Sequence, residues 1–152
     1  MPLDYQQVLE KCYDSTNNAL RTIGGGFIQE KFTKTYSDFS TASTTNTITI
    51  KSLPAGGIIH AVKMKHSASF TGGAISAYTI ACGITGSNTK YHTGRNVFQA
   101  PSEANKWIYT TVGMEDHLAA TTMNATATST SANLNAATAG SVDIWVLYSV
   151  AV

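Results

Sequence analysis

The side chains best suited to chemistry are four histidines and a short run of acidic residues. His60 and His66 have the same strand parity, but in an extended strand they lie about 20 Å apart, so they cannot share one metal ion. The run Glu115, Asp116 and His117 could supply metal ligands or an acid–base pair, although it is more typical of a polar turn after a strand. The sequence contains no HExxH, CxxC or G-x-S-x-G motif. We therefore expect no catalytic residue, no cofactor and no bound metal.

A long polar stretch from Gly86 to Asn105 holds the best candidates for ligand contacts. Gly, Asn, Pro and Ser are scattered through it. A stretch of this length in a compact domain is usually an exposed functional loop, or it contains a short element that the pattern does not reveal. Loops on rigid scaffolds often carry binding residues. The candidates in this loop are Tyr91, His92, Arg95 and Asn96.

Composition limits the classes of partner. Charged residues make up 12% of the 152 residues, against about 25% in a typical protein, and the net charge is +1 without a cluster of Lys and Arg. Nucleic acid is therefore not expected as a partner. No apolar run approaches the ~20 residues that span a bilayer, so we expect no membrane partner. The opening MPLDYQQVLEKCYD has charges where a secretory signal needs an apolar core.

From residue 27 onward the hydrophobic pattern has a period of two, with Gly and Pro turns between the segments. The last segment, SVDIWVLYSVAV, is apolar on both faces, so we expect it to be central in a sheet or covered by another subunit. This pattern predicts an all-β domain over residues 27–152, a β-sandwich with jelly-roll-like topology. We expect Cys12 and Cys82 to be buried free thiols rather than a disulfide.

Residues 1–26 have a different pattern, which predicts a short N-terminal helix followed by an extended arm. An isolated helix of about ten residues is marginal in water, so it must pack on its own domain or on another subunit. The arm, YDSTNNALRTIGGG, has few apolar residues and ends in a hinge formed by Gly24, Gly25 and Gly26. An ordinary surface loop is the alternative interpretation of the arm. The residues on one face of the helix are Tyr5, Val8, Leu9, Cys12 and Tyr13, with Asp4 as the cap.

Several segments resemble small structural proteins of tailed bacteriophages, which include capsid decoration proteins, head fibres and tail-fibre modules. These segments are YDSTNNALRT, ITIKSLPAGGIIHAVKMK, AYTIACGIT and AGSVDIWVLYSV. The resemblance implies an N-terminal anchoring segment followed by a β-sandwich or jelly roll, often as a homotrimer. It also implies that this segment docks on the major capsid protein or on other virion proteins. The docking contacts would come from Leu9, Cys12, Tyr13, Leu20 and Arg21.

We therefore expect a non-enzymatic virion protein that decorates or stabilises a bacteriophage capsid. It would be assembled in the host cytoplasm and would not be secreted through a signal peptide. The alternative is a receptor- or glycan-binding module of a tail fibre or baseplate, which would use the polar loop. A glycan-degrading enzyme would need paired carboxylates, and no pair stands out among the nine acidic residues.

Overall fold

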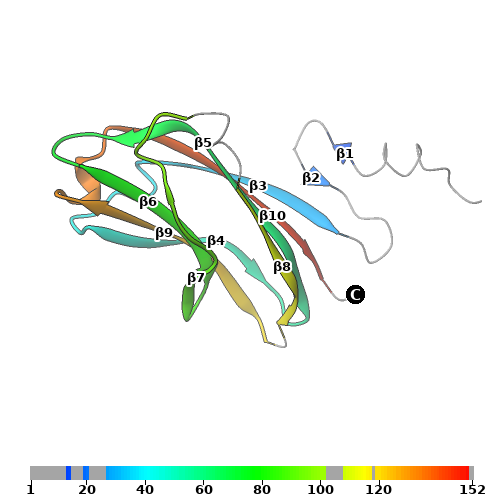
Figure 1. Ribbon diagram of the computed structural model, residues 1–152. Helices are drawn as coiled ribbons and strands as arrows, with labels where there is room; N and C mark the ends of the chain where they lie inside the picture. The colour runs from blue at the N-terminus through cyan, green and yellow to red at the C-terminus, as the bar shows by residue number, and fades with distance from the viewer. Residues whose placement is uncertain (1–12, 15–18, 21–26, 102–107, 118, 151–152) are drawn as a thin grey trace, which may run out of the picture.

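The computed structural model describes residues 13–14, 19–20, 27–101, 108–117 and 119–150, and describes side chains for 27–101 and 119–150. This part of the chain is all-β apart from a short 3-10 turn, η2 (Leu134–Ala136). Its strands form two antiparallel sheets in two layers (Figure 1). The all-β prediction is confirmed, and the two sheets are arranged as in a β-sandwich.

Sheet A contains six strands in the order β1-β2-β3-β10-β5-β8, and sheet B contains four in the order β4-β9-β6-β7. The strands of sheet A are β1 (Tyr13–Asp14), β2 (Ala19–Leu20), β3 (Ile28–Thr35), β10 (Ala139–Ser149), β5 (Gly57–Thr71) and β8 (Ile108–His117). The strands of sheet B are β4 (Thr45–Leu53), β9 (Thr121–Thr130), β6 (Ala77–Ile84) and β7 (Ser87–Asn96).

Strand β10 is central in sheet A, between β3 and β5, as its two apolar faces predict. Its side chains alternate between the core and the outer face of the sheet. Trp145 and Leu147 are partly buried on the outer face. The core-facing residues of β10 are Val142, Ile144, Val146 and Tyr148.

The core between the sheets includes a line of aromatic rings. The ring centroids of Phe39 and Phe70 are 6.3 Å apart, and those of Phe70 and Tyr78 are 4.8 Å apart. The Phe70 ring also packs over Gly140 of β10, where a Cβ atom would clash with the ring. Gly140 has a φ of +140°, a conformation that side-chain-bearing residues rarely adopt. Glycine is therefore required at this position twice over, by space and by backbone conformation.

The stretch from Gly86 to Asn105 follows the second of its two interpretations. It contains an element that the pattern does not reveal, because Ser87–Asn96 forms β7 at the edge of sheet B. Its first four residues are polar and exposed, so they show no apolar alternation. The predicted N-terminal helix and the hinge at residues 24–26 lie outside the described residues, except that Tyr13 belongs to β1.

Cys82 is a buried free thiol, as expected. Burial disfavours the charged thiolate and raises its pKa to about 12. The thiol is therefore uncharged and inert at neutral pH. Cys12 lies outside the described residues.

Candidate interaction surface

Strand β7 carries the four residues predicted to contact a ligand, but it buries three of them. Tyr91, His92 and Arg95 are 1%, 9% and 4% exposed, whereas Asn96 is exposed. The Asn96 carboxamide oxygen accepts a hydrogen bond from the backbone N–H of Phe98 at 3.0 Å, which fixes the turn after the strand. The structure therefore brings these residues together on one strand instead of one exposed loop. Their role in ligand binding stays a prediction.

Arg95 belongs to a buried polar cluster that links the two sheets. Its Nε donates to Nδ1 of His66 on β5 at 3.3 Å. Nε2 of His66 lies 3.1 Å from the backbone oxygen of Gln99. Since a carbonyl oxygen can only accept, the proton of neutral His66 sits on Nε2, and Nδ1 is left to accept from Arg95. Sequence alternation alone does not reveal this cluster, because the partners come from separate strands.

The cluster keeps its histidines neutral. Burial lowers the pKa of His66, and the Arg95 charge lowers it further, while the hydrogen bond to Gln99 opposes the change. Burial and the Arg95 charge likewise lower the pKa of His92, whose two ring nitrogens have no hydrogen-bond partner. Both rings are therefore uncharged at neutral pH. Protonation of either ring in acid would place a second positive charge near the Arg95 guanidinium.

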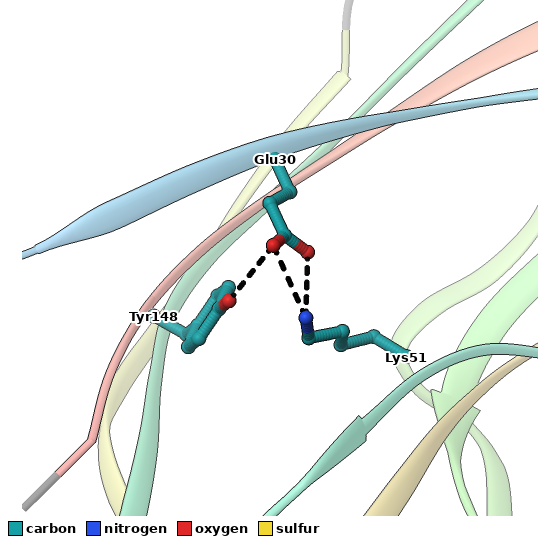
Figure 2. A network of polar contacts seen from close by, with 3 residues as sticks. All are labelled: Glu30, Lys51 and Tyr148. Atoms are coloured by element: carbon teal, nitrogen blue, oxygen red, sulfur yellow. Dashed lines mark hydrogen bonds and ion pairs between the residues drawn. The ribbon is translucent and has the colours of Figure 1, made fainter. Parts of the chain in front are cut away.

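A second polar network joins the sheets through a partly exposed ion pair (Figure 2). Nζ of Lys51, on β4 of sheet B, is 3.0 and 3.1 Å from the two carboxylate oxygens of Glu30, on β3 of sheet A. The hydroxyl of Tyr148 on β10 donates to the same carboxylate at 3.1 Å. Burial by itself would lower the pKa of Lys51, but the hydrogen bonds to Glu30 and Tyr148 outweigh it and raise that pKa.

Simple alternation along the strand predicts that Lys51 faces solvent, on the other face of the strand from Ile50. The pairing of β4 with β9 shifts register between Thr49 and Lys51, as at a β-bulge. A bulge changes which side chains face inward on either side of it. As a result, Lys51 lies on the same face of sheet B as buried Leu53, and its side chain extends toward sheet A.

The outer face of sheet A carries a shallow apolar pocket. It is lined by residues of β3, β5 and β10 around Trp145. The ammonium groups of Lys63 and Lys31 lie 5.3 and 5.8 Å from the centroid of the Trp145 ring, within the range of cation–π contacts. Phe27, at the start of β3, is 57% exposed. We call this surface the Trp145 patch, and it consists of Phe27, Gln29, Ala61, Lys63, Trp145 and Leu147.

Within the ranges that the structure describes, no group of three or more His, Cys, Asp or Glu side chains could hold a metal ion. In the same ranges, no helix has the length and apolar character needed to cross a membrane. The Trp145 patch combines aromatic and aliphatic side chains with flanking lysines, and aromatic side chains are enriched at protein-contact surfaces.

The predicted docking residues lie at or before the first strands. Tyr13 of β1 pairs with Leu20 of β2, and Leu20 pairs with Gln29 of β3, so this segment extends sheet A at its β3 edge. Leu9, Cys12 and Arg21 lie outside the described residues. The docking role of all five stays a prediction.

Comparison with known proteins finds similarity in fold. A chain of the capsid asymmetric unit of cyanophage Pam1 matches with a TM-score of 0.59 at 20% identity, over 91% of this chain and 98% of that chain. A chain of the acidic stable capsid structure of Helicobacter pylori bacteriophage KHP30 matches with a TM-score of 0.46 at 11% identity, over 80% of this chain and 93% of that chain. No protein-family model and no curated protein matches the sequence. The Pam1 likeness shows a shared fold over almost the whole length of both chains.

Proposed function

We propose that this protein is a non-enzymatic structural component of a bacteriophage virion, and that it decorates or stabilises the capsid. The observation that carries the proposal is the match to a Pam1 capsid chain over 98% of that chain, so that almost nothing of the capsid chain is left without a counterpart here. The apolar and cationic outer face of sheet A is also suited to protein contact.

The strand order supports a jelly-roll topology for residues 27–152. Strands β3 to β10 form two four-stranded sheets, in the orders β3-β10-β5-β8 and β4-β9-β6-β7. Successive strands change sheet at every step except from β6 to β7, so the chain crosses repeatedly between the layers. This order is the one expected of a double Greek key, the jelly-roll topology of many viral capsid domains, so it supports that topology here.

The proposal assigns attachment to residues 1–26 and self-association to the sandwich. The arm would dock on the major capsid protein or on other virion proteins through Leu9, Cys12, Tyr13, Leu20 and Arg21, with Gly24 to Gly26 as the hinge. A homotrimer would present three arms to neighbouring shell subunits. Because the trimer links the three arms, binding of one arm raises the effective concentration of the other two at the particle surface. Three weak contacts can then attach the trimer firmly.

Attachment is tested by deleting residues 1–23 and measuring co-sedimentation with particles that lack the protein. We expect binding to be lost while the circular dichroism spectrum keeps its β-sheet signature. The full-length protein with Thr93→Ala, an exposed change on β7 of the opposite sheet, is the control and should bind normally. Normal binding by the truncated protein would show that the arm is not the attachment element.

Location is tested by the copy number in purified virions, measured by quantitative mass spectrometry against the major shell protein. A copy number comparable to that of the shell protein is the expected result for capsid decoration. A small fraction of it would contradict decoration. That outcome would favour a receptor- or glycan-binding module at a vertex fibre or the tail.

A further inference from the structure

Arg95 places a positive charge between the two sheets. It lies on β7 opposite Ile80 of β6, which is fully buried, and Arg95 itself is 4% exposed. Its Nε donates to neutral His66, but its Nη2 is buried without a hydrogen-bond partner among the described residues. An arginine stays protonated at neutral pH, so its burial leaves a charged group that requires an opposite charge.

The carboxylates whose side chains the structure describes are all engaged elsewhere. They are Glu30 with Lys51, Asp38 with Thr35, and Asp143 with Lys31. Burial lowers the pKa of Arg95, and no described carboxylate opposes that change. The described acceptor of Arg95 is the neutral ring of His66. Within this part of the chain the charge of Arg95 is therefore not balanced.

His92 lies beside Arg95 on the core face of β7. It is paired with Cys82 of β6, while Arg95 is paired with Ile80, and those two partners are about 7 Å apart along the strand. The register shifts between these two pairs, where Gly94 has a φ of +128°, so both side chains keep the same face. Both ring nitrogens of His92 are buried and have no hydrogen-bond partner among the described residues. Because a neutral imidazole carries one N–H, Arg95 and His92 together present two unused donors.

We propose that the core side of β7 binds one small monovalent anion of the halide class, held by Nη2 of Arg95 and a ring N–H of His92. One negative charge balances Arg95, since His66 and His92 are neutral. A divalent ion such as sulfate would leave an excess negative charge in the core, and a water molecule would satisfy the donors without balancing the charge.

The position of the site provides a route for the ion. Strand β7 is the edge strand of sheet B, and its first four residues are exposed. Local opening of an edge strand needs less free energy than global unfolding, so an ion can enter from this side. The bound ion would strengthen the connection between the sheets, because Arg95 of sheet B also contacts His66 of sheet A. The inference does not rest on the proposed function.

Urea unfolding of the full-length protein at pH 7.5 tests the site. Sodium chloride is compared with sodium gluconate at equal ionic strength, because gluconate is too large to lie between packed sheets. We expect a higher urea midpoint in chloride. Above the dissociation constant, the folding equilibrium constant should rise about tenfold for each tenfold increase in chloride.

Substitutions assign the chloride effect to the site. Arg95→Met should abolish the difference between the two salts, whereas Thr93→Ala, an exposed change on the same strand, should preserve it. Equal midpoints for the unsubstituted protein in the two salts would overturn the proposal, and they are the expected result if another carboxylate of the chain balances Arg95. A difference that persists in Arg95→Met would also overturn it, because surface charges would then be the cause.

A second measurement needs no substitution. Crystals of the full-length protein grown in sodium bromide should show an anomalous scattering peak between the Arg95 guanidinium and the His92 ring. The absence of a peak there, or peaks confined to surface lysines, would refute the site. Neither measurement involves particles, so failure here and failure of the attachment test are distinguishable.

Discussion

The Glu30 carboxylate links the two sheets because it accepts hydrogen bonds from Lys51 of sheet B and Tyr148 of sheet A. The side chains of Lys51 and Glu30 are each 29% exposed, so solvent screens the ion pair. Its contribution to the free energy of unfolding is therefore about 0.5–1 kcal/mol. We expect Glu30→Gln to lower the free energy of unfolding in urea by that amount. A double-mutant cycle with Lys51→Met isolates the pair. Additive effects of the two substitutions would show that the ion pair does not couple the sheets.

Acid should destabilise the sandwich through its buried histidines. The folded-state pKa values of His66, His92 and His60 are all lowered, with burial as the leading cause. The unfolded chain therefore takes up protons more readily than the folded one. The stability from these neutral histidines is complete above their ordinary pKa of about 6.5 and is lost as the pH falls below it. Urea midpoints at pH 7.5 and pH 5.0 measure the loss.

The residue most responsible for the acid effect can be identified by substitution. His92 makes no hydrogen bond through either ring nitrogen, so His92→Phe removes a titrating group without breaking a hydrogen bond. We expect this variant to lose less stability between pH 7.5 and pH 5.0 than the unsubstituted protein. Thr93→Ala, an exposed change on the same strand that adds no titrating group, is the control. An unchanged pH dependence in His92→Phe would assign the effect to groups other than His92.

At the level of the elements, Gly140 tests how closely β10 packs against the ring of Phe70. Alanine at this position meets the ring and keeps a positive φ, so we expect Gly140→Ala to destabilise the protein by about 2–4 kcal/mol. Gly86→Ala is a matched control, because Gly86 has a φ of +87° but open space where a Cβ would lie. It should carry the backbone cost alone, about 1 kcal/mol. Equal losses in the two variants would mean that the ring yields to the extra methyl group.

The strands show which features a sequence pattern can predict. Period-two alternation predicts β10 as a buried central strand, because both of its faces carry apolar residues. Alternation misses β7, an edge strand whose first four residues face solvent, and it places Lys51 on the wrong side because a bulge shifts the parity of β4. The His66–Arg95 contact depends on two strands 29 residues apart meeting across the core, and spacing along the chain does not encode that meeting.

At the scale of the whole molecule, the sandwich should fold without the segment that precedes it. The described link between the first two strands and the rest of sheet A is the pairing of Leu20 with Gln29, whereas β10 pairs with β3 along eight positions and with β5 along ten. Cooperativity comes from these long ladders and from the core between the sheets. Removing residues 1–26 should therefore preserve a single urea transition with nearly the same slope, because the long ladders and the core lie outside the deleted segment. A broad or multistep transition after truncation would instead mean that the N-terminal segment is an integral part of the folding unit, and the division of the chain at residue 26 would have to be abandoned.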